Sequence, residues 1–262
     1  MLYIASFLIS IIFWIWIIRK YDRFEREPLK NVLFVFIIGG LISIIPASVF
    51  NLLFGYILNY KLDPYSAENY GLGKMLLLHG FVGLNEEFWK ALATVLLIRK
   101  MKQFNEPADA LVYGMTVAFG FSVLENIEYS ARFGFYTFFL RQFNAVPLHI
   151  GLAAIWGMGI TKAKFINQGR YFRTVVPYVL IAAFFHSIYN LSAMLSVSPL
   201  LNLLIPSIIA FLLIRYSVKK IKHYTEEGPF SNLLICQNCG TANGSDARIC
   251  KKCGVAMKGS DV

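Results

Sequence analysis

The chain is organised as seven long apolar runs joined by short polar connections, with a polar tail after the last run. Each run is long enough to cross a bilayer, because about 20 apolar residues in a helix span the hydrocarbon core. Lipid offers backbone amides no partner outside their own helix, so we expect an all-α polytopic membrane protein. The expected spans lie near residues 2–18, 32–59, 75–98, 108–129, 144–163, 174–195 and 199–218.

The first apolar run could be a secretion signal, and the second contains a proline. Residues 2–18 have no basic segment before them and no small-residue cleavage site after them, so we expect a retained span and not a secretion signal. The second run is over-long and contains Pro46, which predicts a kink or a continuation past the membrane interface.

Composition supports lipid as the solvent of this chain. It is 57% hydrophobic and 15% charged, whereas about a quarter of the residues of soluble domains are charged. The net charge of +10 is typical of nucleic-acid-binding proteins as well. However, the basic residues cluster at the ends of apolar runs, where membrane topology explains them. We therefore expect the bilayer as a partner and no specific nucleic acid.

The basic residues also predict an orientation, because cytoplasmic connections are enriched in lysine and arginine. The connections after the first, third, fifth and seventh runs hold 16 such residues, and the alternate connections hold only Lys61, Lys74, Arg132 and Arg141. We expect a multi-pass protein of the cell membrane with its N-terminus outside and its C-terminal tail in the cytoplasm.

Ionisable residues inside the apolar runs are the candidates for chemistry, because a charge at the bilayer centre costs about 2.5–3.5 kcal/mol. In GLNEEFWKAL, helical spacing places Glu86, Glu87 and Lys90 on one polar stripe. A structural glutamate–lysine pair accounts for one carboxylate and leaves the other unexplained. Two adjacent carboxylates beside one lysine suit the activation of water.

Three further spans carry polar groups at comparable depth. These groups are Glu125 and Asn126 near the end of 108–129, His149 early in 144–163, and His186 with Asn190 in 174–195. Together with Glu86 they lie about 6–17 Å below the outer surface at 1.5 Å per residue. Taken alone, each histidine is equally well explained by packing. Four helices with proton-active groups at one depth predict a single hydrated cavity that opens to the outside.

These motifs resemble the PrsW family of intramembrane proteases, which is related to CAAX-prenyl endopeptidases and bacteriocin-processing peptidases. The likeness covers most of residues 20–195. It rests on YDRFEREPL after the first span, EEFWK, DALVYGMTVAFGFSVLENIEY with its FxxxEN core, the histidine of PLHIG and the HxxxN of HSIYN. The CAAX-type relatives carry histidine where Glu125 stands here, so the likeness is to the PrsW branch.

The resemblance implies an intramembrane endopeptidase that cleaves a membrane-associated protein. It implies Glu86 and Glu87 as catalytic glutamates, with Glu125, His149 and His186 completing the site. Some similar proteins cut an anti-sigma factor on its extracytoplasmic side, which agrees with an outward-facing cavity. A different class of function is a transporter or sensor that uses the same buried groups for protons or a ligand. Neither inverted repeats nor paired broken helices support that alternative.

Two mechanisms remain open for a peptidase. In one, Glu86 or Glu87 is the general base, Lys90 tunes the pair, and His186 supported by Asn190 stabilises the oxyanion or protonates the leaving group. In the other, a catalytic metal lies between Glu125, His149 and His186 and activates the water. The sequence has no HExxH motif that would demand zinc in the membrane.

The polar tail contains two CxxCG knuckles in ICQNCGTANGSDARICKKCG. Their cysteines, Cys236, Cys239, Cys250 and Cys253, predict a small ribbon that holds structural Zn²⁺ through four thiolates. A closed site of this kind leaves no position for substrate. We expect a transmembrane peptidase domain over 1–223, a linker over 224–233 and the ribbon over 234–256. The aromatic stretch 132–141 is either a gate over the cavity or an interfacial aromatic belt.

Overall fold

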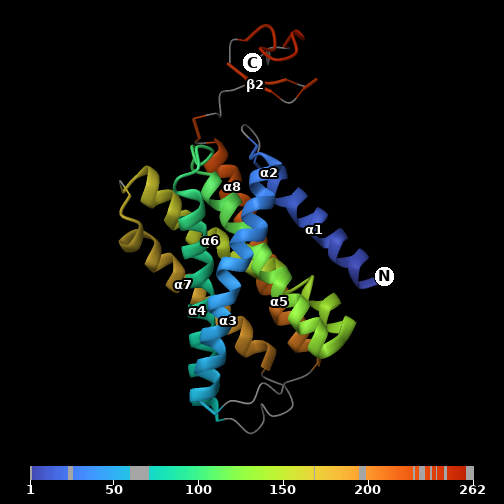
Figure 1. Ribbon diagram of the computed structural model, residues 1–262, viewed down its shortest axis with the longest axis vertical. Coiled ribbons are helices and arrows are strands. Elements are labelled where there is room, and N and C mark those ends of the chain that lie inside the picture. Colours follow the sequence, from blue (N-terminus) through green and yellow to red (C-terminus); the bar gives the residue numbers. More distant parts are fainter. Residues whose placement is uncertain are drawn as a thin grey trace.

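The computed structural model describes residues 2–22, 26–59, 71–167, 169–194, 199–226, 228–229, 234–236, 238–239, 241–244 and 247–257. Its helices are α1 (Leu2–Lys20), α2 (Leu29–Phe34), η1 (Val35–Gly39), α3 (Gly40–Ile57), α4 (Leu72–Ile98), α5 (Asp109–Arg141), α6 (Ala145–Phe165), α7 (Tyr171–Met194) and α8 (Pro199–Glu226). Since α2, η1 and α3 follow one another without a break, each expected span corresponds to one helical segment (Figure 1).

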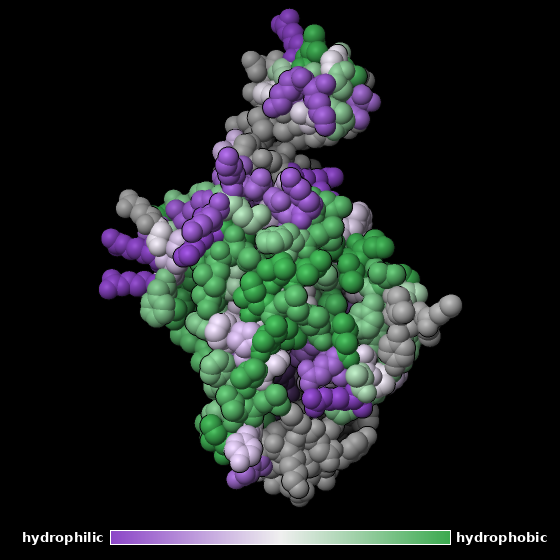
Figure 2. Space-filling view, in the orientation of Figure 1, coloured by the Kyte–Doolittle hydropathy of each residue, from purple (hydrophilic) through white to green (hydrophobic). Residues whose placement is uncertain are grey.

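The all-α membrane architecture is confirmed. Within the described residues, the segments Leu29–Ile57, Asp109–Arg141 and Tyr171–Ser192 are each long and apolar enough to cross a membrane by themselves. Helix α6 is the central helix, since it packs against α5, α7 and α8 and is buried along nearly its whole length. Apolar side chains cover most of the visible surface of the bundle, and hydrophilic side chains gather at the end near the C-terminal ribbon (Figure 2).

Helix α5 is longer than the sequence pattern predicted. It continues past residue 129 to Arg141, with a break at Gly134, where φ is +81° and ψ is −179°. Glycine tolerates this conformation because it has no Cβ. The break changes the direction of the chain, and residues 135–141, which we name the α5 arm, return along the bundle. The stretch 132–141 is therefore helical on both sides of a sharp reversal.

Helix α3 and helix α5 meet at backbone contact distance. The π-helical turn η1 lies before Pro46, at the point where this contact is made. A Cβ on Gly120 would lie 2.1 Å from the carbonyl oxygen of Phe36 and 3.2 Å from the Cα of Gly40. Small residues at such crossings allow helices in lipid to approach closely.

Replacing Gly120 with alanine is therefore expected to destabilise the bundle by about 1–3 kcal/mol, because the two backbones must separate. Unfolding in a graded mixture of mild and denaturing detergent measures this change. Gly55→Ala is the matched control, because a Cβ at Gly55 meets nothing within 4 Å. Equal stability of the two variants would contradict the assigned contact.

The segment between α1 and α2 is held by buried polar groups. The backbone N–H of Glu27 donates to Asp22 (2.8 Å), and Arg19 Nε donates to the carbonyl oxygen of Glu27 (3.2 Å). The Glu27 carboxyl accepts a short hydrogen bond from Tyr113 of α5. Burial and the nearby Asp109 raise the pKa of Glu27 well above its usual range, which favours the neutral carboxyl. Asp22 and Glu27 of the YDRFEREPL motif thus tie the end of α1 and the residues before α2 to the start of α5.

The C-terminal ribbon contains a two-stranded antiparallel sheet. Strand β1 (Leu234–Ile235) pairs with β2 (Ala242–Asn243) in the register Leu234↔Asn243 and Ile235↔Ala242. A further antiparallel bridge joins Ile249 to Ala256. These short pairings bring the two CxxC turns together.

Candidate functional site

Helix α4 supplies the centre of a buried polar cluster. Glu86, Glu87 and Lys90 are all buried, as the polar stripe of this span predicted. Lys90 Nζ donates to Glu87 Oε1 at 2.6 Å and lies 3.6 Å from Glu86 Oε2. Lys90 also lies over the ring of Phe121, 4.3 Å from its centroid. One cation therefore serves two carboxylates, and the structure contains more than an isolated glutamate–lysine pair.

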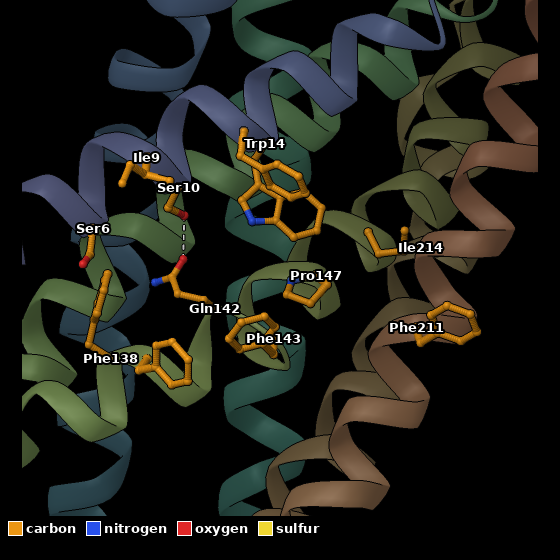
Figure 3. Close-up of a pocket in the computed structure, with 12 residues that line it drawn as sticks. Ser6, Ile9, Ser10, Trp14, Phe138, Gln142, Phe143, Pro147, Phe211 and Ile214 are labelled. Carbon is orange, nitrogen blue, oxygen red and sulfur yellow. Dashed lines mark hydrogen bonds between the residues drawn. The ribbon is translucent and has the colours of Figure 1, made fainter.

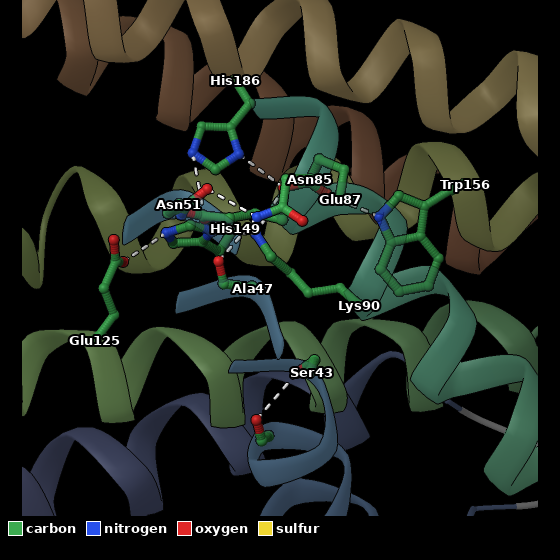
Figure 4. A network of polar contacts seen from close by, with 12 residues as sticks. Ser43, Ala47, Asn51, Asn85, Glu87, Lys90, Glu125, His149, Trp156 and His186 are labelled. Carbon is green, nitrogen blue, oxygen red and sulfur yellow. Dashed lines mark hydrogen bonds and ion pairs between the residues drawn. The ribbon is translucent and has the colours of Figure 1, made fainter. Parts of the chain in front are cut away.

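Glu87 has hydrogen-bond partners on both of its carboxylate oxygens. Besides Lys90, its Oε1 contacts Nδ1 of His186 on α7 at 2.8 Å. Its Oε2 accepts from the indole N–H of Trp156 on α6 at 2.9 Å. When Nδ1 of His186 carries the proton, Nε2 is left as an acceptor, and this atom lies 3.7 Å from Glu86 Oε2. Glu87 thus orients His186 toward Glu86. The contacts of Glu87 with His186 and Trp156 can be followed in Figure 4.

His149 of α6 lies between Lys90 and Glu125. Its Nδ1 is 2.8 Å from Lys90 Nζ, and its Nε2 is 3.0 Å from Glu125 Oε2. Because an ammonium group only donates, a neutral His149 accepts at Nδ1 and donates from Nε2 to Glu125. The rings of His149 and His186 approach edge to face, with centroids 5.1 Å apart. The four helices α4, α5, α6 and α7 therefore meet at one place, as their depths in the sequence predicted.

Arg141 joins this cluster from the end of the α5 arm. Its Nη2 donates to Glu125 Oε2 at 2.6 Å, and its Nε donates to Asn126 Oδ1 at 2.6 Å. The guanidinium also lies 3.8 Å from the ring centroid of Tyr129. Glu125 therefore accepts from both Arg141 and His149. The sequence predicts Arg141 only as a charge of an outer connection, and its contact with Glu125 becomes apparent only in the structure.

Asn51 is a second residue that the sequence analysis did not single out. Its Nδ2 donates to Glu86 Oε1 at 3.2 Å, and its Oδ1 accepts from Asn85 Nδ2 at 2.8 Å. Asn85 also donates to the carbonyl oxygen of Ala47 at 2.8 Å. An asparagine inside a long apolar run is itself a signal, because lipid disfavours its amide. This pair of amides ties α3 to Glu86.

The remaining predicted residues lie at the edge of the cluster. Asn126 is fully buried next to Glu125 and accepts the bond from Arg141. Asn190 lies one turn beyond His186 on α7 and is partly buried. Within the described part of the chain, no hydrogen bond joins Asn190 to His186.

The geometry of the cluster fits a metal ion. One ligand atom each of Glu86, His149 and His186 lies within 4.8 Å of the others, and all three residues are buried. Glu86 Oε2 is buried and has no hydrogen-bond partner among the described residues. One carboxylate and two imidazoles form a donor set typical of catalytic zinc. The structure thus groups Glu86 with the two histidines, while Glu125 is paired with Arg141.

The four ribbon cysteines form a second possible metal site. Their sulfur atoms all lie within 4.8 Å of one another. The Sγ atoms of Cys236 and Cys253 are 3.6 Å apart, and those of Cys239 and Cys250 are 3.5 Å apart. Tetrahedral Zn²⁺ with Zn–S bonds of about 2.3 Å places its sulfurs about 3.8 Å apart. The observed separations are close to this value.

Comparison with known proteins finds the same family by a family model and by individual relatives. Residues 27–216 match the family described as PrsW family intramembrane metalloprotease. The chain is 30% identical over 219 residues to Protease PrsW of Clostridioides difficile (strain 630), covering 81% of this chain and 85% of that protein. It is 31% identical over 170 residues to Protease PrsW of Geobacillus kaustophilus (strain HTA426), covering 64% and 69%. With Protease PrsW of Bacillus subtilis (strain 168) the identity is 27% over 169 residues, covering 64% and 72%. No solved structure matches the chain.

Proposed function

Because the chain belongs to the PrsW family of intramembrane metalloproteases, and so is a membrane-embedded peptidase, we propose that it hydrolyses its substrate at the cluster of Glu86, His149 and His186. The observation that carries this proposal is the convergence of buried carboxylates and imidazoles from four helices around Glu86 Oε2, which accepts no hydrogen bond from the described residues. Hydrolysis needs a base, an oxyanion stabiliser and a proton donor, and this cluster has groups for each role.

We assign the role of general base to Glu86. Its Oε1 is held by Asn51, and its Oε2 is left to accept a proton from water. The resulting hydroxide attacks the peptide carbonyl carbon, and the positive charge of Lys90, which lies 3.6 Å from Glu86 Oε2, stabilises the developing oxyanion. Glu86 then returns the proton to the amine nitrogen as the C–N bond breaks. Glu87 acts as a positioning residue, since it orients His186 and Lys90 without a free oxygen of its own.

A catalytic metal in this family would be held by Glu86, His149 and His186, and Glu86 would then be a ligand and not the general base. Bound there, it would polarise the carbonyl and lower the pKa of a bound water. Lys90 already contacts His149 Nδ1, so metal and ammonium compete for that lone pair. Each histidine contacts a carboxylate through its second ring nitrogen: His186 contacts Glu87, and His149 contacts Glu125. Such carboxylate–histidine pairs orient the histidine ligands of metal sites.

The substrate class that we propose is a membrane-associated protein cleaved on its outer side, such as an anti-sigma-type regulator. The asymmetry of lysine and arginine supports an N-terminus outside and a ribbon in the cytoplasm. Figure 2 supports an opening in the other half of the bundle, where a patch of hydrophilic side chains lies beside a hollow in the apolar surface.

Comparison of new N-termini in cell membranes tests the proposed function. Membranes that contain the chain should show protein fragments that are missing when Glu86→Gln replaces it. Substrate should accumulate uncut and remain bound to this variant. Identical fragments in both membranes would overturn the assignment of the cluster as the hydrolytic site.

Arg141→Gln is expected to lower the cleavage rate about 10–100-fold, because the partner that fixes Glu125, and through it His149, is lost. Arg141→Lys should recover part of the rate, since lysine can reach Glu125. It lacks the planar guanidinium that donates to Glu125 and Asn126 at the same time. Initial rates of substrate cleavage measure both effects.

Arg132→Gln is the matched control for this prediction. Arg132 pairs with Glu128 at 2.7 Å, but these side chains are 44% and 47% exposed, against 13% and 16% for Arg141 and Glu125. An exposed pair contributes about 0–1 kcal/mol, so the rate should stay close to that of the parent chain. A positioning role for Arg141 is wrong if both substitutions have the same effect.

Metal analysis of the full chain separates the two proposed metal sites. We expect about one zinc per chain in the ribbon, which the double substitution Cys239→Ser/Cys253→Ser removes without loss of cleavage. We expect a second metal ion that is lost, together with cleavage, in His149→Ala/His186→Ala. Elemental mass spectrometry and cleavage rates on the same samples provide the test. Unchanged zinc in the cysteine variant would contradict the ribbon site.

A further inference from the structure

A second cavity lies beside α1, apart from the acidic and imidazole cluster. Its volume is about 490 Å³, and its walls come from α1, the α5 arm, the start of α6 and α8. Figure 3 shows Trp14 of α1 facing Phe143 and Pro147 across this space, with Phe211 and Ile214 of α8 at the far side. The cluster and the cavity share the α5 arm as a wall, because Phe138 and Phe139 line the cavity while Arg141 holds Glu125.

The cavity opens toward the lipid-facing surface of the protein. Of its lining residues, Ile9, Phe13, Phe139, Phe143 and Phe211 are all strongly exposed and apolar. In a membrane-embedded peptidase, such a surface is already covered by the hydrocarbon of the bilayer. The cavity is therefore continuous with the existing interface between protein and lipid.

The walls offer almost nothing for a hydrogen-bonding ligand. Among the lining side chains, only Ser6, Ser10, Trp14 and Gln142 carry polar atoms. Ser10 and Gln142 are bonded to each other, with 2.5 Å between Oγ and Oε1. A peptide strand in this cavity would bury backbone amides without hydrogen-bond partners, which is strongly unfavourable in an apolar environment.

A transmembrane helix does not fit inside this cavity. A helix about 10 Å across fills roughly 120 Å³ per residue, so the cavity holds only about four helical residues. A methylene group is similar in size to a water molecule, which fills about 30 Å³ in the liquid. The cavity thus has room for roughly sixteen methylenes, the length of a phospholipid tail.

We infer that this cavity is a binding site for one acyl chain of a membrane phospholipid. The chain has no hydrogen-bonding groups, matches the volume and enters from the lipid-facing side. Van der Waals contact with the cavity walls distinguishes a seated tail from a tail in bulk lipid or detergent, so we expect the seated tail to exchange more slowly.

Native mass spectrometry of the full chain in mild detergent tests this site. We expect one phospholipid per chain after extensive washing, confirmed by quantifying phosphate in a lipid extract. Ile9→Trp places an indole at the mouth and should abolish retention. Ile12→Trp is its control, since Ile12 does not line the cavity yet is 69% exposed, against 67% for Ile9.

A second pair of matched substitutions lies on α8, so its result does not depend on the correct folding of Ile9→Trp in α1. Phe211 lines the cavity and Leu212 does not, although each is 59% exposed. Phe211→Asn should weaken retention at least tenfold and Leu212→Asn should leave it unchanged. Absence of lipid on the parent chain, or equal retention within both pairs, would overturn the acyl-chain site. This readout does not depend on cleavage, so its failure leaves the proposed peptidase site intact.

Discussion

Glu86→Gln is expected to reduce peptide cleavage by about 10²–10⁴-fold while the protein stays folded. Glutamine keeps the shape of the side chain and an oxygen that can accept from Asn51, as Glu86 Oε1 does at 3.2 Å. It cannot take a proton from water, and its amide is a poor metal ligand. Lys90 lies 3.6 Å from Glu86 Oε2 but keeps its 2.6 Å ion pair with Glu87 in this variant, so we expect the fold to tolerate the loss of the Glu86 charge.

Cleavage rates at saturating and at low substrate concentration measure this prediction. The loss should appear mainly in kcat, because a base acts in the transition state and not in substrate binding. Glu128→Gln is the control, since Glu128 lies on the exposed surface of α5 in a pair with Arg132. A Glu86→Gln enzyme within tenfold of the parent rate would remove Glu86 from the role of base.

Glu87→Gln is expected to impair both stability and cleavage. Glu87 Oε1 accepts from Lys90 and His186, and Oε2 accepts from Trp156. In the glutamine variant, an NH₂ group replaces one acceptor and faces a donor. Lys90 also loses a charge partner inside the bundle, and breaking a buried pair in this way costs about 3–5 kcal/mol. Detergent-induced unfolding measures the stability change.

The double variant Glu87→Gln/Lys90→Met distinguishes a charge effect from a packing effect. Removing both charges should recover part of the stability, with a coupling energy of about 0.5–3 kcal/mol, because no lysine is then left without its partner. Cleavage should stay low, since His186 still lacks the acceptor that orients it. Additive losses in the two single variants would show that Glu87 and Lys90 act independently.

Much of the fold was predictable from the apolar runs. Lipid permits few backbone structures, so seven runs of sufficient length led directly to seven helical segments. The return of the α5 arm was not predictable, because a single glycine in an aromatic stretch does not reveal its φ angle. Gly134 adopts +81°, and only tertiary structure shows that Arg141 then reaches back to Glu125.

The centre of the site was more predictable than its supporting residues. Helical spacing placed Glu86, Glu87 and Lys90 on one face, and counting residues from the membrane surface placed His149 and His186 at a similar depth. Trp156 reads as an ordinary core residue, because its hydrogen bond to Glu87 joins residues far apart in sequence. Asn51 was detectable as an amide in an apolar run, but its partner was not.

Hydrolysis in ¹⁸O-labelled water tests the central claim most directly. A membrane substrate identified from the comparison of N-termini is cleaved by the purified full chain, and the new C-terminal carboxyl is weighed by mass spectrometry. The parent enzyme should add one ¹⁸O atom to that carboxyl, and Glu86→Gln should yield no fragment. Fragments without ¹⁸O, or equal amounts of labelled fragment from both proteins, would contradict water activation at Glu86.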